Sequence, residues 1–185
     1  MKTLDHADVV GLLGAVNLKK PFGLRDHAMI RLALFTGLRV AELVGLNVGD
    51  VRGKSWLQLP AAIAKGRRGR EIPLSRFAIQ AVSELLHFLD MRGFKSGDQD
   101  PLLQDRCHHR LSVGAVQRAV RSARVAAALG IKATPHVLRH SFASECSRRG
   151  SLRAVQQVLG HRYLSSTEVY LHTRPEDLVA IVQRD

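Results

Sequence analysis

Apolar residues recur at helical spacing over much of the chain. One helical stripe covers residues 5–17 and begins after Asp5, a residue type that often caps helices. Residues 23–37 are rich in apolar side chains, which predicts a buried helix that ends at Gly37. A short helix with its apolar residues facing the core is expected over residues 40–46.

The pattern changes over residues 51–74. Apolar residues precede a turn rich in Gly and Arg at 65–69, and a second short apolar stretch follows at 71–74. Two such stretches around a glycine-containing turn predict an antiparallel β-hairpin near residues 55–74, with a basic tip.

Helical spacing returns after the hairpin. A polar stretch rich in Gly and Asp at 92–110 is expected to be a loop, and Pro135 can open a helix because the first turn needs no N–H. The predicted fold is α+β, mainly α-helical, in one domain of residues 1–185 with one small antiparallel sheet. The later helices are predicted over residues 76–91, 112–129, 136–148, 151–159, 165–172 and 175–182.

The charge balance indicates an anionic partner. Lys and Arg outnumber Asp and Glu by 28 to 16, which gives a formal net charge of +12. Double-stranded DNA fits this charge best, since the basic residues are spread along the chain and form no polybasic tail for a membrane surface. No apolar run approaches the ~20 residues that span a bilayer, and the start lacks a secretion signal. A soluble, cytoplasmic protein without membrane contact is therefore expected.

The two cysteines, Cys107 and Cys146, are too few for a disulfide framework and are expected to stay reduced. Cys107 is followed by two histidines, but no second ligand pair stands at zinc-like spacing. We predict no metal site, and the absence of a Gly-rich phosphate loop also argues against a nucleotide cofactor.

Four segments together resemble the tyrosine recombinase or phage-integrase family, especially its Xer-like members. They are TGLRVAELVGL, AKGRRGREIPL, HVLRHSFA and LGHRYLSSTEVYLH, in this order, and the resemblance covers nearly the whole chain. Each string is weak alone, but their order and spacing are jointly specific. The resemblance implies a catalytic set of Arg39, Lys65, His136, Arg139, His161 and Tyr170.

The implied reaction is transesterification of DNA through a 3′-phosphotyrosyl link at Tyr170. Cleavage of a phosphodiester by a side chain requires a nucleophile, a charge clamp and a proton for the leaving oxygen. Arg39 and Arg139 can present forked donors to the phosphate oxygens. Glu42 is expected to hold Arg39; an ion pair with a purely structural purpose is the alternative for Arg39, and a surface ion pair for Arg139.

The hairpin residue Lys65 would protonate the departing 5′ oxygen, although its position alone suggests one more cation for the DNA backbone. Arg67, Arg68 and Arg70 would steer the hairpin toward the duplex. On helix 112–129, phosphate contact and a solvated face are equally weighted for Arg118, Arg121 and Arg124.

His136 lies one helical turn before Arg139, near a helix N-terminus that favours a phosphate. It is the candidate proton acceptor for Tyr170, and His161 would donate a hydrogen bond to the phosphate; capping or core histidines are the alternative for both. His140 is expected to point elsewhere and receives no role, like His172. A core aromatic is the alternative for Tyr170, and the family register excludes Tyr163 as the nucleophile.

The family usually carries a helical core-binding (SAM-like) domain before the catalytic one. Because the catalytic pattern starts almost at Met1, that domain is expected to be absent, in an excised fragment or a naturally minimal recombinase. The C-terminal segment 174–185 has an apolar stripe that either docks on a neighbouring subunit of a homo-oligomer, as the resemblance suggests, or packs on its own domain. A type IB topoisomerase-like relaxase and a non-catalytic DNA-binding regulator are the alternative functions.

Overall fold

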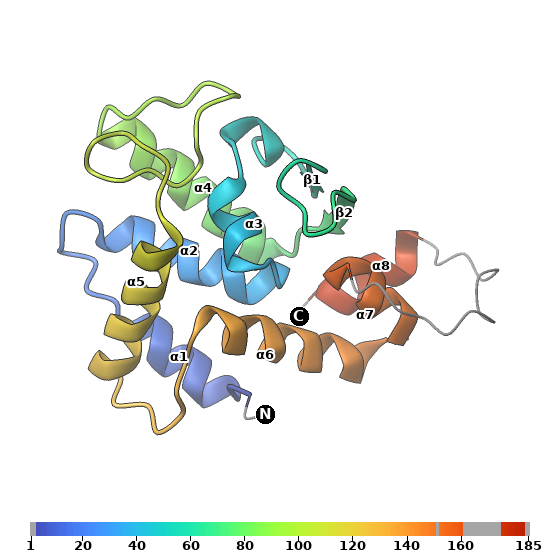
Figure 1. Ribbon diagram of the computed structural model, residues 1–185. Helices are drawn as coiled ribbons and strands as arrows, with labels where there is room; N and C mark the ends of the chain where they lie inside the picture. The colour runs from blue at the N-terminus through green and yellow to red at the C-terminus, as the bar shows by residue number, and fades with distance from the viewer. Residues whose placement is uncertain (1–2, 151, 161–174, 184–185) are drawn as a thin grey trace.

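The computed structural model describes residues 3–150, 152–160 and 175–183. Its helices surround a central helix, and a two-stranded sheet lies at one side (Figure 1). The α+β, mainly helical fold predicted from the sequence is confirmed. The elements are α1 (His6–Gly14), α2 (Gly23–Thr36), α3 (Val40–Gly45), the 3-10 helix η1 (Val48–Asp50), β1 (Trp56–Leu59), β2 (Arg70–Pro73), α4 (Arg76–Met91), α5 (Val113–Ala126), α6 (Pro135–Arg149), α7 (Leu152–Leu159) and α8 (Pro175–Val182).

The central helix is α2, which packs mainly against α4 and α6. Every residue from Ala28 to Thr36 is buried, as the mostly apolar composition of the segment predicts. Gly37 ends the helix in the left-handed region at φ +61°, with its N–H bonded to the carbonyl of Ala33. The buried helix thus fixes where the chain turns toward α3.

The hairpin differs from its prediction in the length of its connection. Leu57 pairs with Ile72 in an antiparallel register, and both side chains are completely buried. The first strand ends before Pro60, whose carbonyl accepts the N–H groups of Ile63 and Ala64 in a tight turn. The connection therefore spans residues 60–69, longer than the predicted turn at 65–69, and it carries Lys65.

The loop 92–110 contains no helix or strand, as predicted, but it is tied to the rest of the fold. Short β-bridges join Asn47 to Pro101 and Gln104 to Arg110. Arg110 donates hydrogen bonds to the carbonyls of Val44 and Leu46, at 2.7 and 2.9 Å. This loop therefore supports the end of α3.

The C-terminal helix α8 packs on its own chain, against α6, α7 and β2. Leu178, Ile181 and Val182, which form the apolar stripe seen in the sequence, are at most 5% exposed. Packing on the same domain, the second of the two predicted alternatives, is therefore the arrangement in this structure. In the part of the chain that the structure describes, every helix is too short or too polar to cross a membrane.

Candidate active site

Arg39 lies at the sharp junction between α2 and α3. A Cβ on Gly37 would come within 2.3 Å of the Phe142 ring, so the close packing of α6 and the positive φ both require glycine here. The turn leaves Arg39 as the residue before α3, with its side chain lining a cavity.

The carboxylate of Glu42 is buried beneath Arg39. Its Oε2 accepts the backbone N–H of Arg39 at 2.9 Å, and its Oε1 accepts Arg39 Nη1 at 3.0 Å. The predicted ion pair between these two residues is thereby confirmed. Arg70 grips the same carboxylate with Nη1 at 3.1 Å and Nη2 at 2.9 Å.

These contacts decide the charge of Glu42. Burial alone would raise its pKa, since its side chain is only 1% exposed, but the hydrogen bonds and charges of Arg70 and Arg39 lower the pKa to about 2. Glu42 is therefore an anion at neutral pH, and it fixes the orientation of both guanidinium groups.

Arg70 requires a correction of the prediction. It was expected to face DNA with Arg67 and Arg68, but it pairs with Leu59 at the base of the hairpin, and its side chain is 10% exposed. Besides gripping Glu42, its Nε donates to the carbonyl of Val158 in α7 at 2.8 Å. Arg67 and Arg68 remain exposed on the connection. A run of basic residues in the sequence does not distinguish the tip of a hairpin from its buried base.

Helix α6 supplies His136 and Arg139. The hydroxyl of Thr134 caps the helix by accepting the N–H of Val137, and Pro135 occupies the first turn. His136 is exposed at this end, whereas Arg139 is 8% exposed one turn later. The two residues therefore lie one helical turn apart, as predicted from the sequence, and His136 is accessible to solvent whereas Arg139 is buried.

Arg139 connects the ends of two other helices. Its guanidinium donates to the carbonyl of Gly37 and, at 2.8 Å, to the carbonyl of Leu159. Burial, followed by the positive charge of Arg39, lowers the pKa of Arg139 to about 10, and Glu42 acts in the opposite direction. The group still carries its charge at neutral pH.

Four of the six predicted residues meet at one cavity of about 380 Å³: Arg39, Lys65, His136 and Arg139. They come from the α2–α3 junction, the hairpin connection and α6, which lie far apart in the sequence. The other two, His161 and Tyr170, lie outside the described residues. Val40, Pro135, His140, Ala143 and Leu159 complete the lining.

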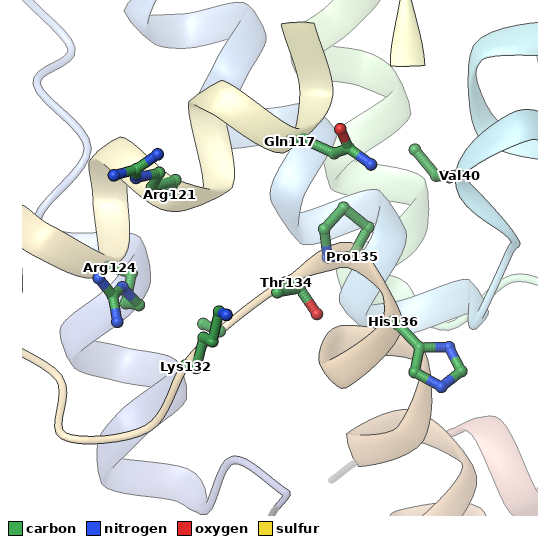
Figure 2. A pocket seen from close by; sticks show the side chains of 9 residues that line it. Val40, Gln117, Arg121, Arg124, Lys132, Thr134, Pro135 and His136 are labelled. Carbon is green, nitrogen blue, oxygen red and sulfur yellow. The ribbon is translucent and has the colours of Figure 1, made fainter. Parts of the chain in front are cut away.

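A second cavity of about 550 Å³ adjoins the first and shares His136, Pro135 and Val40 with it. Figure 2 shows Arg121 and Arg124 on α5, with Lys132 in the approach to α6. Arg118 is exposed but does not line this cavity. The three predicted arginines of α5 therefore do not share one environment.

Two residues that line the cavities, His140 and Lys132, were not predicted to belong to the site. His140 was expected to point elsewhere, but it lines the first cavity, and its Nε2 lies 3.0 Å from Nε2 of His136. The available signal was the i,i+4 spacing of the two histidines, which places them on one helical face. Lys132 lies in the short link before α6 and has no sequence pattern that distinguishes it from other surface lysines.

Both cavities are suited to an anion. Their described lining contains six Arg and Lys side chains together with His136 and His140, and no carboxylate among the described residues lines either cavity. Forked and buried guanidiniums favour a phosphate, whose oxygens they can contact at two points. Within the described ranges, no three His, Cys, Asp or Glu side chains are grouped to hold a metal ion.

Comparisons with known proteins agree with this geometry. Residues 2–177 match the model of the Phage integrase family. Over 184 residues, the chain is 34% identical to tyrosine recombinase XerC of Salmonella typhi and 33% identical to XerC of Escherichia coli O157:H7. These alignments cover 97% of this chain but only 58% and 59% of the two relatives.

Solved structures show the same fold. The XerA recombinase superposes with a TM-score of 0.73 at 26% identity, covering 96% of this chain and 63% of that one. A lambda integrase tetramer bound to a Holliday junction superposes with a TM-score of 0.67 at 22% identity, covering 89% of this chain and 48% of that one.

Proposed function

This chain belongs to the phage integrase family, and we propose that it is the catalytic part of a site-specific DNA recombinase that cuts and rejoins duplex DNA through Tyr170. The convergence of Arg39, Lys65, His136 and Arg139 on one cavity is the observation that carries the proposal. The chain spans about 58% of the length of the XerC relative from Salmonella typhi. That this chain carries out recombination is therefore a proposal and does not follow from the similarity alone.

The described residues supply two of the three requirements of the reaction. Arg39 and Arg139 bind the non-bridging oxygens of the scissile phosphate and stabilise the charge that grows there in the transition state. Lys65 gives a proton to the departing 5′ oxygen. Lys65 lies on an exposed connection and already lines the cavity that holds the two arginines, so its ammonium group is close to the proposed phosphate site.

The nucleophile completes the reaction. The oxygen of Tyr170 attacks phosphorus, its proton passes to His136, the bond to the 5′ oxygen breaks, and a 3′-phosphotyrosyl link forms. His161 donates a hydrogen bond to a phosphate oxygen. The reverse steps join a new 5′ hydroxyl to the same phosphorus, so the energy of the bond is conserved without ATP.

The basic residues on the surface indicate how the protein would contact duplex DNA. The arginines Arg67 and Arg68 on the hairpin connection, with Arg121, Arg124 and Lys132 beside the second cavity, contact phosphates along the duplex, and the exposed Arg118 of α5 contacts a further phosphate. We propose that several copies assemble on DNA and that the protein acts in the cytoplasm. With α8 packed on its own chain, docking through the segment 174–185 would require this helix to move first.

Covalent trapping tests the proposal without knowledge of the target site. A pool of duplexes with randomised arms and a nick near the centre is incubated with the protein at low salt, then denatured in SDS. Cleavage beside the nick releases a short oligonucleotide, so rejoining fails and the adduct persists. DNA that remains bound to protein is amplified and used for further rounds.

The two tyrosines of the chain provide a matched control. We expect adducts with the native protein and with Tyr163→Phe, and none with Tyr170→Phe. Adducts that survive Tyr170→Phe would assign another nucleophile, and no adduct from any pool would favour a DNA-binding regulator. Relaxation of plasmids that lack any selected sequence would instead indicate a topoisomerase-like enzyme.

A further inference from the structure

Helix α6 places two histidines in contact at the cavity. Nε2 of His136 lies 3.0 Å from Nε2 of His140, and the two rings meet nearly at right angles, with centroids 4.4 Å apart. Both side chains line the cavity that contains Arg39, Lys65 and Arg139. This contact is between the proposed proton acceptor and a residue to which the reaction above gives no role.

The contact restricts how many protons the pair can hold. A hydrogen bond between two ring nitrogens contains one proton, so one Nε2 must donate and the other must accept. If His140 donates, a neutral His136 carries its single ring proton on Nδ1 and has no free acceptor for a proton from Tyr170. If His136 donates, its Nδ1 is bare and can accept that proton.

The surroundings favour a neutral His140. Burial, and then the positive charges around it, lower the pKa of this imidazole. Arg39, Lys65 and Arg139 share its cavity, while Arg121, Arg124 and Lys132 lie on the other side of His136. All six are cations, and no described carboxylate lines either cavity to stabilise a second imidazolium.

We propose that His140 is a positioning residue, whose neutral Nε2 accepts the Nε2–H of His136 and thereby keeps Nδ1 of His136 available as the proton acceptor. This inference rests on the proposed function, since it gives the reason why His136 can receive a proton. When Tyr170 attacks, its proton moves to Nδ1 of His136, and the resulting imidazolium remains hydrogen-bonded to His140. On rejoining, the same proton returns to the tyrosine oxygen.

The tautomers can be observed directly in the free protein. Two-dimensional 15N–1H correlation spectra of the imidazole rings distinguish a bare ring nitrogen from one that carries a proton. We expect His136 to be protonated at Nε2 and bare at Nδ1 at neutral pH, and the pair to take up one proton in the first acidic step. A His136 protonated at Nδ1, or two rings that titrate independently, would overturn the proposal.

Variants of His140 test the consequence for the reaction. His140→Leu removes the acceptor and should slow adduct formation by about 10–100-fold, the usual cost of losing an orienting partner. Without the acceptor, the imidazolium of His136 is less stable, so the acidic limb of the rate–pH profile should move to lower pH. His140→Gln offers an amide oxygen in place of the ring nitrogen and should restore most of the rate and the position of this limb.

Controls separate positioning from simple stability. His87 is exposed on α4 and lines neither cavity, so His87→Leu should leave the rate and the profile unchanged. Equal losses in His140→Leu and His140→Gln, in parallel with their melting temperatures and with an unmoved acidic limb, would show that His140 only supports the fold. If the native protein forms no adduct, the proposed function fails, whereas the ring spectra still decide the tautomer of His136.

Discussion

On one side of the cavity, Glu42, Arg70 and Arg139 are enclosed and hydrogen-bonded to one another or to the ends of helices, whereas on the other side Lys65 and His136 are exposed. The enclosed residues have fixed charges, and their contacts join α2, α3, the hairpin and α7. The exposed ones are those to which the proposed reaction assigns proton transfer. The charges around the proposed phosphate site are thus built into the fold, while the groups to which proton transfer is assigned are open to solvent.

The largest change in stability is expected when the buried carboxylate of Glu42 is replaced by a neutral group. Glu42→Gln leaves Arg39 and Arg70 facing a neutral amide, and breaking a buried ion pair from one side costs about 3–5 kcal/mol. We expect a loss of this size in the free energy of unfolding, measured by urea denaturation. Glu145→Gln is the matched control, because Glu145 pairs with Arg148 and Arg149 near the surface and should contribute less than ~1 kcal/mol. Equal losses in the two variants would show that the enclosed carboxylate of Glu42 stabilises the fold no more than a carboxylate near the surface.

Protonation of Glu42 at low pH should also lower the free energy of unfolding, because it removes the same negative charge. The pKa of Glu42 is lowered from 4.5 to about 2 in the folded protein, so its contribution is fully present above pH 4.5 and is lost as the pH falls toward 2. A shift of this size corresponds to about 3 kcal/mol. Urea denaturation between pH 6 and pH 2 should therefore show a loss that is smaller in Glu42→Gln by about this amount. An identical pH dependence in the two proteins would show that the carboxylate is not held as the structure indicates.

Substitution of an exposed residue at the cavity should change the rate of DNA cleavage and leave the free energy of unfolding unchanged. Lys65→Met removes the proposed proton donor and should slow cleavage by about 100-fold or more, while urea denaturation stays unchanged. A substrate with sulfur in place of the bridging 5′ oxygen should restore the rate, because a thiolate leaves without protonation. Cleavage of the sulfur substrate that is slowed as strongly as cleavage of ordinary DNA would exclude Lys65 as the proton donor.

The sequence allowed this division to be predicted only in part. The buried helix α2, the cap and proline that open α6, and the Arg39–Glu42 pair all follow from local spacing, because residues within a helical turn determine them. Arg70 was misplaced because its environment depends on its pairing with Leu59 and on the approach of α7, both distant in the chain. The length of the hairpin connection likewise depends on where Pro60 ends the first strand, and this was not visible in the pattern of apolar residues.

The smallest effects are expected from the arginines at the surface. Arg67→Ala and Arg68→Ala should each weaken DNA binding by a similar factor on any sequence and reduce the slope of log affinity against log salt by about 1, since each removes one phosphate contact. Arg70→Lys keeps the charge but not the fork that holds Glu42, so it should lower stability and leave this slope unchanged. Fluorescence anisotropy with a labelled duplex at several salt concentrations measures the slope. A slope that falls in Arg70→Lys but not in Arg67→Ala would place the DNA at the base of the hairpin and would remove the distinction drawn between its two ends.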